Sequence, residues 1–277
     1  MFRANSTTTP VAEWRQPAPV SPNGKVLAAP ARQGLRGRLS ERLADVFEAS
    51  EDENRRVILD LIAAGPPRAR LVDLGCFNGA FTVDLAAAAR ASEIVGVEWL
   101  PQHATAARVR GIQVVEADLN GPMPFEDASF DLVHSNQLIE HLRGTDAFLR
   151  EAGRICAPGG RIVISTNNLS SWHNVGALVL GMQPLPLHVS DEIHVGNPFD
   201  PRRGRRHADV GQTHLRVFTT RALRELAQAH GLRVTAARLN GYYPLPPVLA
   251  RRAARIDPLH AAFIVLELAH ADSADTR

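Results

Sequence analysis

The chain of 277 residues has only two cysteines, Cys76 and Cys156, and no apolar run close to the roughly 18 residues that span a bilayer. Two cysteines are too few to cross-link a domain of this length by disulfides. We therefore expect no disulfide framework, and we expect the protein to occur in a reducing compartment. Residues 1–20 lack the apolar core of a secretory signal peptide. These absences predict a cytoplasmic protein without a membrane span.

A strong charge of either sign is also missing. The 31 basic and 29 acidic residues leave a formal net charge of +2. A dedicated nucleic-acid-binding protein carries a denser basic stripe, so we expect no nucleic-acid partner. Hydrophobic residues make up 45% of the chain, close to the globular average, which permits a sizeable core.

The chain divides into parts of different character. Residues 1–36 are rich in Pro, Ala, Thr and Gly without a period, and we expect them to be disordered. Residues 37–268 are expected to form the domain. Within it, residues 167–217 show little periodicity, which predicts a substrate-side insertion or lid. Residues 269–277 are expected to be a flexible tail.

Helical and extended patterns alternate through the domain. We expect one helix capped by Ser40 and a second over residues 54–64. Strands are then expected over 70–74, 93–98, 112–116, 130–134 and 161–166, with helices over 80–90, 101–110, 138–144 and 145–156 between them. A helix over 219–230 and strands over 233–239 and 261–268 follow the aperiodic part. Such alternation predicts an α/β fold with a parallel sheet and helices on both faces.

The most informative segment runs from Leu71 to Gly79, where an apolar strand ends in an acid and a glycine-containing turn leads into a helix. Ligands of open α/β sheets bind at the carboxyl ends of the strands, and glycine lets the backbone approach them closely. The next two strands also end in acids, Glu98 and Asp118. A carboxylate about 20 residues after such a turn can accept both hydroxyls of a ribose, and Asp118 is placed to accept from an exocyclic amine. Each feature alone fits an ordinary turn or a solvated strand end; the joint spacing favours a nucleotide-like ligand.

Residues 69–169 resemble the class I S-adenosylmethionine (SAM)-dependent methyltransferases often described as type 11. The first motif of that family, Val-Leu-Asp-x-Gly-x-Gly-x-Gly, is matched by Leu71, Val72, Asp73, Gly75 and Gly79. Its fourth-strand motif is matched by residues 130–133 and 139–142, and its fifth-strand signature by residues 154–164. A less sharp similarity extends to residues 213–219 and 229–231. The middle glycine of the first motif is replaced by Phe77, which we expect to crowd the methionine end of the cofactor.

The resemblance implies a Rossmann-like, doubly wound sheet of seven mostly parallel strands, with an antiparallel last strand and the insertion after strand five. It also implies SAM as the cofactor. Asp73 would face the methionyl group, Glu98 the ribose and Asp118 the adenine amine. The full set of implied cofactor-binding residues is Asp73, Gly75, Cys76, Gly79, Glu98, Trp99, Asp118, Leu119, Asn136 and Gln137. Cys76 is interpreted as a small apolar turn residue rather than a nucleophile.

Catalytic residues are harder to assign. If the acceptor is a hydroxyl group, a general base helps, and His141 and His214 are the candidates. Either could instead have a structural role. No pair of histidines has the tight spacing of a zinc motif with cysteine partners, so we expect no metal site. The basic run 202–207 could meet an anionic acceptor or be a solvated loop, and residues 242–247 could line an acceptor pocket or be a rigid connector.

We therefore expect methyl transfer to a small-molecule acceptor, with an oxygen of a sugar, lipid or secondary metabolite favoured. One alternative is a catalytically silent SAM-binding or scaffold protein, suggested by Phe77 alone. A second is a nicotinamide-dependent oxidoreductase, which would need a Gly-x-Gly-x-x-Gly turn that this sequence lacks. An RNA methyltransferase is disfavoured by the weak charge bias. The oligomeric state cannot be inferred from the sequence.

Overall fold

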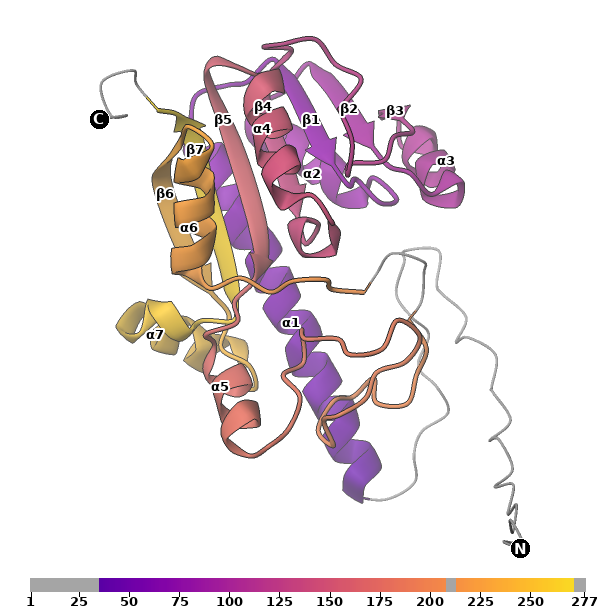
Figure 1. The fold of residues 1–277 in the computed structure, drawn as a ribbon, viewed down its shortest axis with the longest axis vertical. Coiled ribbons are helices and arrows are strands. Elements are labelled where there is room, and N and C mark those ends of the chain that lie inside the picture. The colour runs from indigo at the N-terminus through magenta and orange to yellow at the C-terminus, as the bar shows by residue number, and fades with distance from the viewer. Residues whose placement is uncertain (1–34, 208–212, 272–277) are drawn as a thin grey trace, which may run out of the picture. The chain divides into compact units, whose positions relative to one another are not determined.

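The computed structural model describes residues 35–207 and 213–271, which form a single sheet with helices on both faces (Figure 1). The expectation of disorder over residues 1–36 lies outside the described residues as far as residue 34, and it is wrong for residues 35 and 36, which begin a helix. Of the expected flexible tail over 269–277, residues 272–277 lie outside the described residues. None of the described helices is long and apolar enough to cross a bilayer.

Seven strands make up the sheet, in the order β3-β2-β1-β4-β5-β7-β6. The strands are β1 (Arg70–Leu74), β2 (Glu93–Val97), β3 (Gln113–Val115), β4 (Phe130–Asn136), β5 (Cys156–Asn167), β6 (Leu232–Asn240) and β7 (Phe263–His270). Strands β1 to β5 pair in parallel, whereas β7 runs antiparallel to both of its neighbours, β5 and β6. The expected doubly wound, mostly parallel seven-stranded sheet is confirmed.

Helices cover the two faces in separate groups. On one face lie α1 (Leu35–Ala63), α2 (Ala80–Ala89) and α3 (Pro101–Val109); on the other lie α4 (Thr145–Ile155) and α6 (Thr220–Ala229) (Figure 1). Ile58, Ile62 and Leu85 pack against the strands from the first face. Phe148 and Leu149 pack from the second face in a larger apolar cluster. Both clusters are built on strand residues that alternate between the faces, as the pleat requires.

The helix α1 differs from the expectation of two helices. One continuous helix runs from Leu35 to Ala63, so Ser40 lies inside it and does not cap it. Residues 38–63 contain neither glycine nor proline, and nothing in the backbone ends the helix there. Asn54, expected near a helix start, is instead buried in mid-helix, with its amide hydrogen-bonded to other side chains.

The insertion over residues 167–217 contains one helix that its sequence pattern did not predict, α5 (Trp172–Val179). A short antiparallel bridge between Ile193 and Arg206 makes the following stretch a hairpin. The helix α7 (Pro247–Ile256), with a 3-10 turn, η2 (Pro258–His260), was also not predicted. The strand β7 extends to His270, so the expected flexible tail cannot begin at residue 269.

Candidate active site

The carboxyl ends of β1, β2 and β4 meet at one edge of the sheet, because the three strands are parallel and in register. Asp73 of β1 pairs with Gly96 of β2 on one side and His134 of β4 on the other. The chain leaves β1 toward β2 and later returns to β4, so β1 and β4 flank the topological switch point. Ligands of doubly wound sheets bind in the crevice at this position.

The turn after β1 is held against β2 by its own backbone. Gly75 N and Cys76 N both donate to Val97 O, at 2.9 and 3.0 Å. Gly75 and Gly79 have φ angles of 79° and 78°, a region that favours glycine. At Gly79 a Cβ atom would also lie 2.5 Å from Ile112 Cδ1, so a side chain there has no room.

Phe77 occupies the same turn with a φ of 49°, which is uncommon for a bulky residue. This backbone conformation explains why glycine suits the position. The Phe77 ring lies against His103 of α3, with ring centroids 4.0 Å apart, and remains 37% exposed.

Asp73 is buried, and other side chains occupy both of its oxygens. Thr82 Oγ1 donates to Asp73 Oδ2 at 2.6 Å, and His134 Nδ1 lies 2.7 Å from Asp73 Oδ1. Each carboxylate oxygen keeps a further lone pair, but the side chain is only 4% exposed. The contact with His134 was not predicted, although this histidine ends the strand that was expected over residues 130–134.

Glu98 follows β2, and its carboxylate connects two backbone segments. Glu98 Oε2 accepts from Phe77 N at 3.1 Å, and Oε1 accepts from Leu100 N at 2.9 Å. The side chain is buried, with 7% exposed. A carboxylate is thereby fixed beside the glycine turn, with one lone pair of each oxygen still available.

The remaining residues of the β2 and β3 ends are less enclosed. Trp99 is 52% exposed. Asp118 is exposed, and its Oδ1 accepts from both the backbone and the side chain of Asn120, at 2.9 and 2.8 Å. Leu119 beside it is buried in the main apolar cluster. The Asp118 carboxylate is held in place by this local turn.

The end of β4 carries the two predicted amides. Asn136 Oδ1 accepts from Asn54 Nδ2 of α1 at 3.2 Å. Gln137 has a φ of 51°, and its Oε1 accepts from Asn167 Nδ2 at 2.6 Å. Its Nε2 is buried without a hydrogen-bond partner. Strained backbone and an unpaired buried donor are features that gather at ligand sites.

The two candidate bases, His141 and His214, are brought together although 73 residues separate them. Their ring centroids lie 4.7 Å apart. His141 Nδ1 lies 3.2 Å from Thr213 O, and His214 Nδ1 lies 2.8 Å from Pro186 O. A carbonyl oxygen can only accept, so each neutral ring carries its proton on Nδ1 and offers Nε2 as a base. Burial is the main cause that lowers the pKa of His214 well below its usual value, which keeps the ring neutral.

Glu140, next to His141, is a functional candidate that the sequence reasoning missed. Its side chain is fully buried, and Thr166 Oγ1 donates to Oε2 at 2.8 Å. Burial raises its pKa to about 7, and its hydrogen bonds only partly offset this effect. The residue belongs to the segment 139–142 already noted in the fourth-strand motif, so that motif was the available signal.

Cys76 is buried behind the turn and packs with Ala107 and Ile112. Burial, together with the nearby charges of Asp73 and Glu98, raises the pKa of its thiol to about 12. The thiolate, which is the nucleophilic form, is therefore scarce at neutral pH.

A family model described as a methyltransferase domain matches residues 46–237, more than half of the chain. The chain belongs to this family of methyltransferases. The family membership identifies the protein as an enzyme of the SAM-dependent methyltransferase class.

Curated relatives and a solved structure agree with this assignment. A malonyl-[acyl-carrier protein] O-methyltransferase of Methylococcus capsulatus is 33% identical over 37% of this chain and 38% of its own length. A chloroplastic tocopherol O-methyltransferase of Arabidopsis thaliana is 33% identical over 45% of this chain and 36% of its own length. The alignments thus span little more than a third of these relatives. A solved S-adenosylmethionine-dependent methyltransferase of Mesorhizobium loti shares the fold, with a TM-score of 0.51 and 18% sequence identity. The match covers 76% of the present chain and 95% of the Mesorhizobium loti chain.

Proposed function

We propose that this methyltransferase takes the methyl group of SAM and transfers it to an oxygen atom of a small-molecule acceptor. The observation that supports the cofactor most directly is the position of Glu98, a buried carboxylate bonded to the glycine turn at the switch point of the sheet. Its free lone pairs suit the two hydroxyl groups of a ribose.

The other residues of this edge fit the remaining parts of SAM. The unpaired Nε2 of Gln137 is a donor suited to the carboxylate of the methionyl group. Asp118 is oriented by Asn120 and suits the adenine amine, with Trp99 and Leu119 beside it. Both oxygens of Asp73 are engaged, so we assign it to holding the turn, with Gly75, Cys76 and Gly79 giving backbone contacts. Asn136, the last residue of β4, is the remaining residue that we assign to cofactor binding at this edge.

The methyl carbon of bound SAM is activated by the adjacent sulfonium, so the protein has mainly to position the acceptor. We infer that Nε2 of His141 removes the acceptor proton and that His214 orients the acceptor beside it. Both rings are fixed through Nδ1 to backbone carbonyls. Residues 167–217 supply His214 and are proposed to cover the acceptor within a domain that includes residues 35–270. The O-methyltransferases among the relatives favour oxygen as the accepting atom.

The cofactor assignment is tested by calorimetric titration of the purified chain with SAM and with S-adenosylhomocysteine. Glu98→Ala should weaken binding by roughly 10- to 100-fold, because each lost bond to a charged group is worth about 1.5–3 kcal/mol. Asp118→Ala should weaken it by about 10-fold or less, because its site is exposed.

Glu93→Ala is the matched control, since Glu93 lies exposed at the opposite end of β2. It should bind as the wild-type protein does. Equal affinity of the wild type and Glu98→Ala would contradict the proposed ribose contact, and absence of SAM binding to the wild type would contradict the function.

The acceptor class needs a second experiment. The chain is incubated with SAM bearing an isotopically labelled methyl group and with separate small-molecule, RNA and protein fractions of a cell extract. Label is expected in the small-molecule fraction, and His141→Gln should slow its incorporation by about 10²- to 10⁴-fold with SAM affinity unchanged. Label confined to RNA or protein would overturn the small-molecule assignment.

A further inference from the structure

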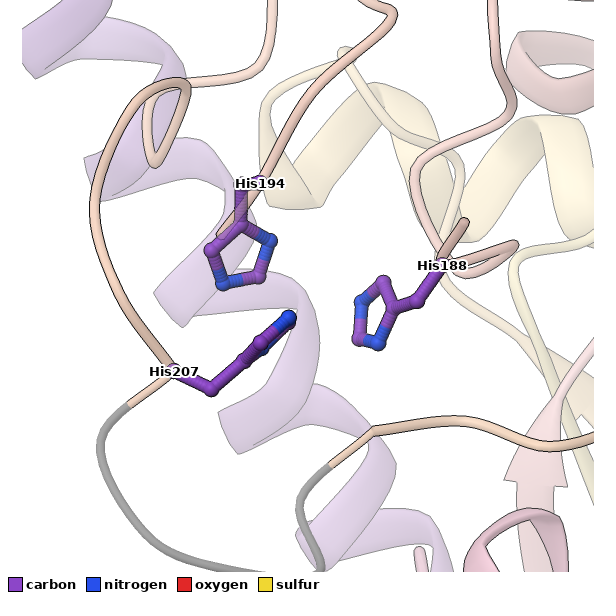
Figure 2. A group of neighbouring side chains, drawn as sticks. All are labelled: His188, His194 and His207. Atoms are coloured by element: carbon purple, nitrogen blue, oxygen red, sulfur yellow. The ribbon is translucent and has the colours of Figure 1, made fainter. Parts of the chain in front are cut away.

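Three histidines of the insertion gather into one cluster away from the glycine turn. Figure 2 shows the side chains of His188, His194 and His207 directed toward one another. One candidate ligand atom from each residue can be chosen so that all three lie within 4.8 Å of one another. The ring centroids of His194 and His207 are 4.3 Å apart. We call these three residues the histidine cluster.

The hairpin of the insertion explains why the three residues meet. His194 N donates to Arg205 O at 3.0 Å, and His207 N donates to Glu192 O at 3.0 Å. These bonds pair His194 with Arg205 and His207 with Glu192 around the bridge of Ile193 and Arg206, so the two histidines are diagonal neighbours on two antiparallel segments. His188 reaches them from the chain that enters the hairpin, and the backbone N of His214 donates to its Nδ1 at 3.1 Å.

Two ring nitrogens of the cluster lack partners although they are buried. His194 is only 8% exposed, and its Nδ1 has no hydrogen bond. The Nε2 of His188 is likewise buried and unpaired. Leaving a buried polar group unsatisfied costs roughly 1–3 kcal/mol, so two such groups in one cluster indicate a missing partner.

A carboxylate completes the arrangement. Asp200 Oδ2 lies 3.8 Å from His194 Nδ1, and the Asp200 side chain is only 7% exposed. Its Oδ1 accepts from the backbone N of Arg202 at 2.8 Å, which fixes the group. A cavity of about 10 Å³ opens beside His188, His194 and Asp200, close to the space that one water molecule or ion needs.

We propose that the histidine cluster, with Asp200, binds one divalent transition-metal ion of the zinc class. Three imidazoles and a carboxylate form a ligand set that zinc accepts in tetrahedral sites. With bonds of about 2.0–2.1 Å, neighbouring ligand atoms lie about 3.4 Å apart, so the rings need to close in by roughly 1 Å. The site holds the insertion together and does not depend on the proposed methyl transfer.

The tautomer of the third histidine also suits metal binding. His207 Nε2 lies 3.1 Å from Ser190 O, so its proton sits there and Nδ1 is free to coordinate.

Metal coordination requires His188 to change its tautomer and to lose a hydrogen bond. Because its Nδ1 accepts from the backbone of His214, the neutral ring carries its proton on Nε2. Coordination through Nε2 moves that proton to Nδ1 by exchange with solvent and breaks the bond to His214 N. Metal binding therefore shifts the segment that carries one of the two candidate bases.

The proposal departs from the expectation of no metal site, which rested on the spacing of residues along the sequence. His194 follows His188 by six residues, and His207 follows His194 by thirteen, without cysteine partners. Only the hairpin makes them neighbours.

The test uses the full chain, produced without a polyhistidine tag and stripped of metal by a chelator. Zinc is titrated in competition with a chromogenic chelator, and the bound metal is counted by mass spectrometry. One zinc per chain is expected. His194→Gln and His207→Gln should each weaken binding by at least about 100-fold, and Asp200→Asn by about 10-fold.

His270→Gln is the control, because His270 is an exposed residue at the end of β7. It should bind zinc as the wild type does. Circular dichroism and SAM titration show whether each variant is folded, so that a loss of zinc binding can be assigned to the ligand removed. Failure of the wild type to compete for zinc would overturn the proposal. So would equal affinity in folded His194→Gln, or loss only in His141→Gln, which would place the ion at the Glu140, His141 and His214 group instead.

Discussion

At the scale of single residues, Glu140 combines complete burial with hydrogen bonds from two neutral side chains, Thr166 and Asn167. Its pKa of about 7 in the folded chain exceeds the unfolded value of 4.5. The folded state therefore binds more protons than the unfolded state between these values. Stability contributed by the protonated form is present below pH 4.5 and is lost as the pH rises through about 7.

Glu140→Gln should remove this dependence. We expect wild-type stability to fall, relative to the variant, by on the order of 1–3 kcal/mol between pH 4.5 and 8. Urea unfolding followed by circular dichroism at several pH values measures the difference. Parallel stability curves for the two proteins would show that Glu140 ionises normally.

Asp73 is a second buried acidic residue, and its removal is expected to lower the stability of the protein. Removing its carboxylate leaves Thr82 and His134 without their buried partner. We expect Asp73→Ala to lower the free energy of unfolding by roughly 2–5 kcal/mol. The control is Asp84→Ala, an exposed position on α2, which should change stability by less than about 0.5 kcal/mol. Similar unfolding midpoints for both variants would refute the structural role assigned to Asp73.

At the scale of elements, the side-chain amide of Asn54 links the helix α1 to three strands of the sheet. Asn54 Nδ2 donates to Ser165 Oγ at 2.9 Å and to Asn136 Oδ1 at 3.2 Å, while Asn240 Nδ2 donates to Asn54 Oδ1 at 3.0 Å. One side chain thus connects the helix to β4, β5 and β6. It also orients Asn136 at the candidate cofactor edge.

Asn54→Ala should therefore destabilise the protein by roughly 2–4 kcal/mol, because the buried Ser165 and Asn240 and the half-buried Asn136 lose a partner. SAM affinity should fall as well, through Asn136. Thermal unfolding and calorimetry measure the two effects, with the exposed Asp52→Ala of the same helix as control. An unchanged melting temperature would mean that the surroundings rearrange to satisfy these groups without Asn54.

At the scale of the whole molecule, the last strand lies inside the sheet. β7 pairs with β5 from Phe263 to Leu268 on one side and with β6 from Phe263 to His270 on the other. Residues Ile264, Val265 and Leu266 are fully buried. A chain ended at Asp257 would expose both partner strands, and we expect it to show no cooperative unfolding transition. A sharp thermal transition in that truncated chain would contradict a structural requirement for β7.

The parts of the structure that could be predicted from sequence are those set by local patterns. The range of β1 was predicted to the residue, and the acid after β2 reaches the glycine turn that follows β1 because parallel strands end at one edge. The continuity of α1 was missed although residues 38–63 contain neither glycine nor proline, whereas the buried partners of Asn54 in three distant strands have no signal in the sequence. The meeting of His188, His194 and His207 depends on a hairpin whose sequence has no alternating pattern.

The interior position of β7 bears on synthesis of the chain in the cell. The strand position between β5 and β6 can be occupied only after residues 263–270 have left the ribosome. Until then two strand edges, rich in unpaired backbone groups, are open to other chains. The sheet is therefore completed only after every residue that builds the candidate cofactor site has been synthesised.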